Sequence, residues 1–259
     1  TWTLVASPYI VTGGITIGGI DRTNTATLNI EPGVEVRFEQ GVDIVVGYKD
    51  GNGNYYGAIN AQGTEELPIR LTSNAATPQP GDWKGIYFSD QATDSLIVFD
   101  HCIIEYGGGN GYGNLYFVKA SGIIRNSTIS YSGSSGIYLV NSPNPVVDNC
   151  SISNNAGYGV YASGSSPILA NNSFINNSSY AVSLDCSGTS NLGINAATGN
   201  GTDGVELRTG WVGSDTVWPY TTLPYIITGG IAVCGIDRMN TATLNIEPGV
   251  EVRFEQGVD

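Results

Sequence analysis

A short pattern that recurs every 22 or 23 residues in the middle of the chain restricts the fold more than any other feature of the sequence. The segments 123–130 (IIRNSTIS), 146–153 (VVDNCSIS) and 168–175 (ILANNSFI) align without gaps, and each is followed by a second apolar segment. Apolar and polar residues alternate within the segments, and Gly, Asn, Ser and Pro separate them, as in strands joined by turns. A unit of strands and turns that repeats in register predicts an all-β fold, a parallel β-helix with coils of about 22 residues.

The fourth position of each segment is an asparagine, namely Asn126, Asn149 and Asn171. Equivalent positions of a β-helix stack about 4.8 Å apart. Asparagine tolerates left-handed backbone geometry, and its amide can hydrogen-bond to the same group one coil away. We therefore expect a structural ladder at one bend. The frame extends upstream to 98–104, where His101 takes the asparagine position.

Charged residues make up only 13% of the chain, which also contains 36 Gly. Stacking explains the low charge, because like charges repeated about 5 Å apart repel each other. The formal net charge of −13, without any basic cluster, argues against binding of nucleic acid. No stretch approaches the ~18 consecutive apolar residues of a membrane span, so none is expected.

A much longer repeat joins the two ends of the sequence. Residues 9–43 recur at 225–259 with 30 of 35 positions identical, and 24–43 return unchanged as 240–259. We interpret 1–216 as one complete module and 217–259 as the start of the next, a repeat of 1–43. The expected partners are copies of this chain or adjacent tandem modules.

Three further segments carry a resemblance to a known group: 28–38 (LNIEPGVEVRF), 61–73 (AQGTEELPIRLTS) and 81–88 (GDWKGIYF). They are similar to right-handed parallel β-helix modules of the pectin-lyase-like type. The resemblance is greatest to modules of large secreted prokaryotic surface proteins, including the disaggregatase-related repeats of methanogen envelopes. It implies a location outside the cell or on its surface, and an envelope polysaccharide as a further partner. The same phrases occur in lyases, adhesins and envelope proteins, so they leave the activity open.

Enzymes on this fold imply candidate catalytic residues. Lyases combine carboxylate-held calcium with a Lys or Arg base, whereas hydrolases need carboxylates close together. Asp100, Arg125 and Asp148 occupy equivalent positions on successive coils, and the single histidine, His101, adjoins them. The alternative is a structural one, in which the three charges form an ion-pair ladder and His101 caps the bend.

A calcium ligand pattern occurs once. Asp50, Asn52 and Asn54 have the spacing that opens an EF-hand-type loop. Tyr55 stands where that loop needs Gly, however, and Ala61 where it needs Glu. The alternative is a hairpin that projects from a coil, and no other cofactor is expected.

Aromatic residues concentrate in loops and could stack on sugar rings. The candidates for carbohydrate binding are Tyr55, Tyr106, Tyr112 and Trp83. The alternative for Trp83 is that its Gly-Asp-Trp turn packs against the coil surface.

The four cysteines, Cys102, Cys150, Cys186 and Cys234, include no Cys-x-x-Cys pair that would favour a zinc site. Cys102 and Cys150 should lie two coils apart, beyond the reach of a disulfide, as buried free thiols.

Three functions fit these observations. The first is a non-catalytic structural module of an extracellular tandem-repeat surface, sheath or fibre protein, which assembles by end-on continuation of coils. The second is a polysaccharide lyase or glycoside hydrolase, or an accessory domain of one, acting on an envelope glycan. The third is a non-catalytic carbohydrate-binding or adhesin module.

Overall fold

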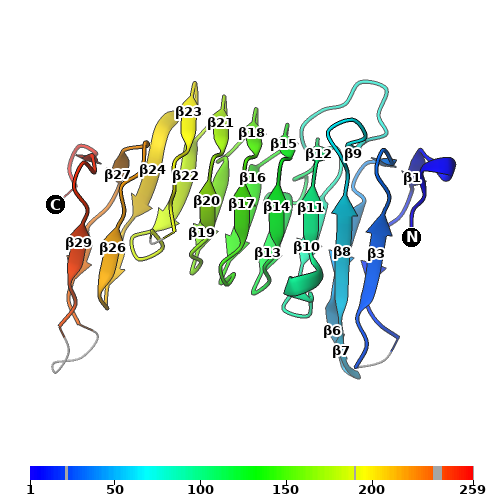
Figure 1. The fold of residues 1–259 in the computed structure, drawn as a ribbon, viewed down its shortest axis with the longest axis horizontal. Coiled ribbons are helices and arrows are strands. Elements are labelled where there is room, and N and C mark those ends of the chain that lie inside the picture. The colour runs from blue at the N-terminus through cyan, green and yellow to red at the C-terminus, as the bar shows by residue number, and fades with distance from the viewer. Residues whose placement is uncertain (21–22, 190, 236–240, 259) are drawn as a thin grey trace.

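The computed structural model describes residues 1–20, 23–189, 191–235 and 241–258. The chain winds into a rod of stacked coils with its two termini at opposite ends (Figure 1). Short strands make up nearly all of the regular structure, and the helical elements described are two 3-10 turns, η1 (Leu4–Ala6) and η2 (Asp94–Leu96). No helix in the described ranges is long and apolar enough to cross a membrane. The predicted all-β fold, a parallel β-helix, is confirmed.

Three parallel sheets run along the rod. Sheet A consists of β3 (Ala26–Ile30), β8 (Gly57–Gln62), β11 (Val98–Asp100), β14 (Ile123–Arg125), β17 (Val146–Asp148) and β20 (Ile168–Ala170). Sheet B consists of β1 (Tyr9–Val11), β4 (Glu35–Phe38), β9 (Ile69–Ser73), β12 (Cys102–Glu105), β15 (Thr128–Ser130), β18 (Ser151–Ser153), β21 (Ser173–Ile175) and β23 (Ala196–Thr198). Sheet C consists of β2 (Ile15–Ile17), β5 (Asp43–Val46), β10 (Gly85–Phe88), β13 (Gly113–Val118), β16 (Ser135–Val140), β19 (Val160–Ser163), β22 (Tyr180–Asp185), β24 (Thr202–Arg208), β27 (Tyr225–Ile227) and β30 (Val252–Phe254).

Smaller pairs complete the topology. Near the C-terminus, β25 (Gly210–Val212) pairs with β28 (Ile231–Val233), and β26 (Thr216–Trp218) pairs with β29 (Leu244–Ile246). An antiparallel hairpin of β6 (Tyr48–Asp50) and β7 (Gly53–Tyr55) projects from one coil.

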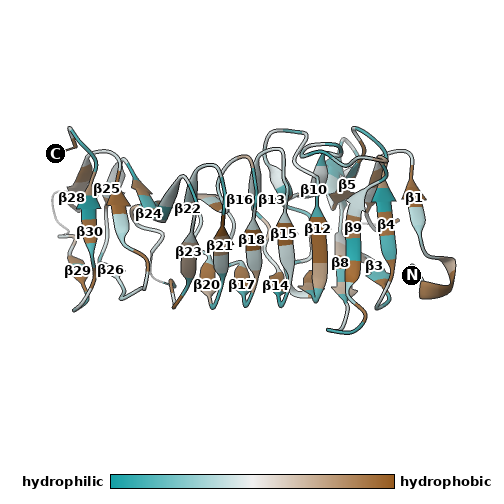
Figure 2. Cartoon of the chain, turned by 90° about the horizontal axis from the view of Figure 1, so that it is seen from above, coloured by the Kyte–Doolittle hydropathy of each residue, from teal (hydrophilic) through white to brown (hydrophobic). Residues whose placement is uncertain are grey.

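Alternation along each strand creates the core. Hydrophobic and hydrophilic residues alternate along strands such as β4 and β9 (Figure 2), and the apolar ones point inward. The register between strands places apolar residues of one coil directly over apolar residues of the next. One such buried column in sheet C consists of Ile44, Ile86, Leu115, Ile137, Val160, Val182 and Val205. Aromatic rings stack in the same way, as Phe88 does on Phe117 with centroids 4.2 Å apart. Burial of these apolar faces, at about 25 cal/mol per Å², is the main force holding the rod together.

The second copy of the long repeat rebuilds the strands of the first but in a different sheet. Strands β27 and β30 repeat β1 and β4 in sequence. The first pair lies at one end of sheet B, whereas β27 and β30 extend sheet C. From β1 to β23, along sheet B, the chain makes seven coils. The step from β23 to β24 in sheet C adds about a third of a coil, and the step from β24 to β27 adds one more coil. One repeat therefore holds about eight and a third coils, so the ladder of sheet C passes into strands equivalent to those of sheet B.

Candidate functional site

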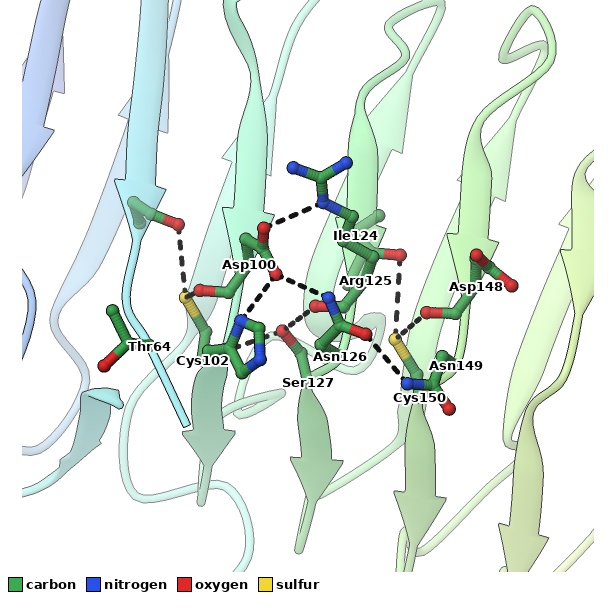
Figure 3. A network of polar contacts seen from close by, with 12 residues as sticks. Thr64, Asp100, Cys102, Ile124, Arg125, Asn126, Ser127, Asp148, Asn149 and Cys150 are labelled. Carbon is green, nitrogen blue, oxygen red and sulfur yellow. Dashed lines mark hydrogen bonds and ion pairs between the residues drawn. The ribbon is translucent and has the colours of Figure 1, made fainter. Parts of the chain in front are cut away.

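The predicted catalytic residues lie together where sheet A turns into sheet B (Figure 3). Arg125 Nε and Asn126 Nδ2 each donate to a carboxylate oxygen of Asp100 at 2.8 Å. Nδ1 of His101 is also 2.8 Å from Asp100 Oδ1, but its orientation gives no hydrogen bond. Arg125 lies between Asp100 and Asp148 in register, as predicted, and its hydrogen bond goes to Asp100.

This environment keeps Asp100 ionised. Burial alone would raise its pKa, but the hydrogen bonds from Asn126 and Arg125 and the charge of Arg125 outweigh burial and lower it. A carboxylate already engaged by these donors suits a structural cap better than a general acid.

The predicted asparagine ladder is only partly a chain of amides. Asn149 Nδ2 donates to Asn126 Oδ1 at 2.8 Å. Asn171 instead donates to the Asp148 carboxylate at 2.9 Å, so the ladder alternates between amides and carboxylates. Residues His101, Asn126, Asn149 and Asn171 all have φ between 47° and 57°, in the left-handed region that the bend requires.

A second kind of ladder, inside the corners, is absent from the sequence predictions. At all three corners a residue with positive φ is followed by a buried small or polar residue. Where sheet B turns into sheet C, Asn155 Nδ2 donates to Asn177 Oδ1, and Asn177 Nδ2 donates to Asn200 Oδ1, both at 2.8 Å. The sequence signal was the doublets 154–155, 171–172 and 176–177, in which the first Asn turns the backbone and the second points inward.

The calcium candidates lie on the hairpin of β6 and β7. Asp50 Oδ1 accepts the backbone N–H groups of Asn52, at 2.7 Å, and Gly53, at 3.0 Å. Tyr48 and Tyr55 stack across the hairpin with centroids 4.5 Å apart. The carboxylate thus closes the turn, and the projecting hairpin of the alternative prediction is the geometry found.

The predicted sugar-stacking residues do not share one surface. Trp83 is wrong as a candidate, because it is fully buried, stacks on Phe38 at 4.1 Å and donates Nε1–H to the Glu105 carbonyl. Tyr106 stacks on Tyr131 at the corner between sheets B and C. Of the four, Tyr112 alone adjoins the aromatic face described next.

Four tyrosines occupy one register position on the outer face of sheet C. The tyrosine column consists of Tyr87, Tyr116, Tyr138 and Tyr161. Successive centroids are 5.2, 5.5 and 4.5 Å apart, and Tyr112 stacks on Tyr116 at 4.2 Å. Burial, followed by the neighbouring Tyr161, raises the pKa of Tyr138 to about 12, so the phenol is neutral at physiological pH. The signal in the sequence was the tyrosine at the centre of the second apolar segment, which marks an outward position only once register is known.

Charged groups continue the column toward the C-terminus. The Arg208 guanidinium lies 4.4 Å from the Tyr161 ring centroid and donates to Asp185 Oδ1 at 2.6 Å. Glu206 is buried and accepts the hydroxyls of Ser183, at 2.5 Å, and Thr228, at 3.2 Å. Each of these charges already has a partner within the protein, so the cluster ties neighbouring coils together.

Comparison with known proteins decides the family. The model of a family described as a right-handed β-helix region matches residues 58–210, more than half of the chain. The chain belongs to this β-helix family. A solved structure, that of the pectate lyase Pel9A, aligns with a TM-score of 0.38 and 13% identity over 89% of this chain and 70% of that chain. No curated protein matches. The resemblance seen in the sequence is thereby confirmed at the level of the right-handed parallel β-helix.

Membership of the β-helix family specifies the scaffold and leaves its chemistry to the side chains. The described residues include no group of three or more His, Cys, Asp or Glu side chains that could hold a metal ion. Cys102 and Cys150 are buried free thiols, as predicted, and burial raises the pKa of each to about 12. They are therefore protonated and unreactive at neutral pH.

Proposed function

We propose that this chain is a non-catalytic structural module of an extracellular tandem-repeat surface, sheath or fibre protein, in which coils continue end on from one module into the next. One observation carries the proposal: identical residues are covered in the first copy of the repeat and uncovered in the second. Phe38 is fully buried, whereas its counterpart Phe254 is 65% exposed. Ile30 is 4% exposed, whereas its counterpart Ile246 is 51% exposed.

The stacking of a further coil accounts for this difference. Phe38 is covered by Trp83, which belongs to the coils that follow it. A repeat of those coils after residue 259 would place the same cover over Phe254. Exposed apolar surface and open strand edges favour continuation of the stack.

A chain with two complete 216-residue modules tests the proposal. Amides of 252–254 should exchange with deuterium as slowly as those of 36–38, and electron micrographs should show one unbroken rod. Exchange at 252–254 as fast as in the 259-residue chain would contradict end-on continuation.

The tyrosine column favours a second candidate function, non-catalytic binding of a neutral glycan chain. Rings, ring edges and phenol hydroxyls recur once per coil, about 4.8 Å apart, along the rod axis. Sugars pack their apolar ring faces on aromatic side chains and hydrogen-bond to neighbouring polar groups.

Affinity electrophoresis in gels containing soluble neutral polysaccharides tests this second function. Tyr112→Ala should abolish retardation, whereas Tyr131→Ala should preserve it. The two tyrosines are 40% and 39% exposed, but Tyr112 stacks on Tyr116 of the tyrosine column, whereas Tyr131 stacks on Tyr106 at another corner. Equal effects of both substitutions, or no retardation of the unaltered chain, would exclude the site.

The enzyme hypothesis has its own measurement. The chain is incubated with a panel of acidic and neutral polysaccharides and assayed for unsaturated products and new reducing ends. Products that disappear in Asp100→Ala or His101→Ala would establish a lyase or hydrolase and would overturn the structural proposal.

A further inference from the structure

The two copies of the repeated segment present opposite faces to the rest of the protein. We call residues 1–43 the first opening segment and 217–258 the second opening segment. The first packs against the coils that follow it, through β5, β8 and β9. The second packs against the coil that precedes it, through β24 and β25. Each copy therefore shows which surface the other copy is able to cover.

Three residues that fix the first opening segment to the coils after it have identical counterparts in the second opening segment. In sheet A, Asn60 Nδ2 donates to Asn29 Oδ1 at 3.1 Å. In sheet B, Val36 is the register partner of Leu71. Inside the rod, Phe38 stacks on Trp83. The counterparts of Asn29, Val36 and Phe38 are Asn245, Val252 and Phe254, which are identical in type.

The second opening segment has an apolar face without cover in this chain. A hollow of about 350 Å³ is lined by Trp218, Ile227, Ile231, Val233, Leu244, Ile246, Val252 and Phe254. In the first opening segment the equivalents of the last two, Val36 and Phe38, are fully buried. The matching cover is thus the coil at 44–88.

We propose that the second opening segment of one chain replaces the first opening segment of another, which joins two chains into one continuous stack of coils. The partner is a second copy of this chain. This inference rests on the proposed end-on continuation and specifies how separate chains join. The exchange breaks one interface and forms a closely similar one, in which Phe254 takes the place of Phe38 beside Trp83. It therefore follows the principle of domain swapping, in which identical elements change places at low cost.

Cysteine cross-linking tests the exchange in the full chain. The background is Cys234→Ser, because Cys234 is exposed whereas the other three thiols are buried. Adding Asn245→Cys and Asn60→Cys places two thiols on neighbouring strands only if the exchange occurs, at a separation that a disulfide can span. We expect disulfide-linked dimers and longer species on denaturing gels, increasing with protein concentration. Asn245→Cys with Ile123→Cys is the matched control, because Ile123 is an exposed position of the same sheet two coils further along.

A locked variant separates exchange from simpler contact between rod ends. Asn29→Cys with Asn60→Cys ties the first opening segment to its own coil, so oxidised protein should lose the ability to assemble and regain it on reduction. Assembly that persists in the locked form would overturn the exchange, as would cross-linking no greater than that of the control. Either result leaves end-on continuation to be judged by the two-module chain.

Discussion

The corners of the β-helix are made one residue at a time. A residue in the left-handed region turns the backbone, and the next residue points a small or polar side chain into the rod. Asn149 and Cys150 are one such pair, with φ of 51° at Asn149 and a buried thiol at Cys150. The abundance of Asn and Gly follows from this requirement, since both tolerate positive φ.

The network around Asp100 makes stability depend on pH. Its folded-state pKa is lower than the ordinary 3.8, so its contribution is complete above the unfolded pKa and is lost as pH falls through the folded pKa. Asp100→Asn should reduce the free energy of unfolding at pH 7 by about 1–3 kcal/mol. Urea unfolding from pH 7 downward should show the difference from the unaltered protein narrowing below about pH 4. A difference that stays constant over this range would contradict the assignment.

The buried amide ladder should be far more sensitive than the outer one. Asn177→Ala leaves the amide of Asn155 and the side chain of Asn200 without a shared partner, and should cost about 2–3 kcal/mol in urea unfolding. The adjacent Asn176→Gly is the control, because Asn176 is exposed at φ 53° and glycine adopts that geometry. Its effect should stay within about 0.5 kcal/mol. Equal effects would remove the distinction between the two ladders.

How much a strand contributes to stability depends on whether a further coil covers its apolar side chains. The three residues of β30 are identical to the last three of β4, yet Phe38 is buried while Phe254 is exposed to solvent. Sequence alone could place both in strands because the alternation of apolar residues is local. It could not show that Trp83 would be the cover of Phe38, because its turn reaches a neighbouring coil through a contact 45 residues away in the chain.

Paired truncations measure the value of that cover. Phe38→Ala should lower the free energy of unfolding by about 3–5 kcal/mol, the range for a buried Phe in a packed core. Phe254→Ala, the same change in an identical sequence, should cost less than about 1 kcal/mol. Denaturant midpoints of the two variants, with equal slopes, provide the comparison. Equal losses would mean that Phe254 is covered in solution, for example by another chain.

Over the whole molecule, the sequence predicted the coil architecture better than the arrangement of side chains on the outer faces. The coil period and the ladder asparagines follow from local patterns that any β-helix must satisfy. The tyrosine column was missed because Tyr116, Tyr138 and Tyr161 look like ordinary strand residues until the register aligns them. The sequence also did not predict that the second copy of the long repeat enters sheet C rather than sheet B. Residues 186–224 depart from the repeating pattern from which the register could be derived.

The junction between the two repeats should open before the rest of the rod. β25 pairs with β28 and β26 with β29 in two-stranded ladders, whereas sheet C runs through ten strands. Short ladders with few buried neighbours open at low free energy. Native-state hydrogen exchange should therefore show β28 and β29 exchanging well before β16 and β19. Uniform protection along the rod would contradict this order.

The passage of sheet C into strands equivalent to those of sheet B has a consequence for how an array would carry load. Among the described strands, sheets A and B end at β20 and β23, whereas sheet C and the short ladder of β25 and β28 cross the boundary between repeats. If each boundary is alike, a ladder that crosses as sheet C becomes sheet B of the next repeat and ends there, while a new one begins beside it. The ladders would then begin and end at different places along the rod, and neighbouring ladders would overlap. Tension along the axis would pass from each ladder to the ladder beside it, because no single ladder would run the length of the array.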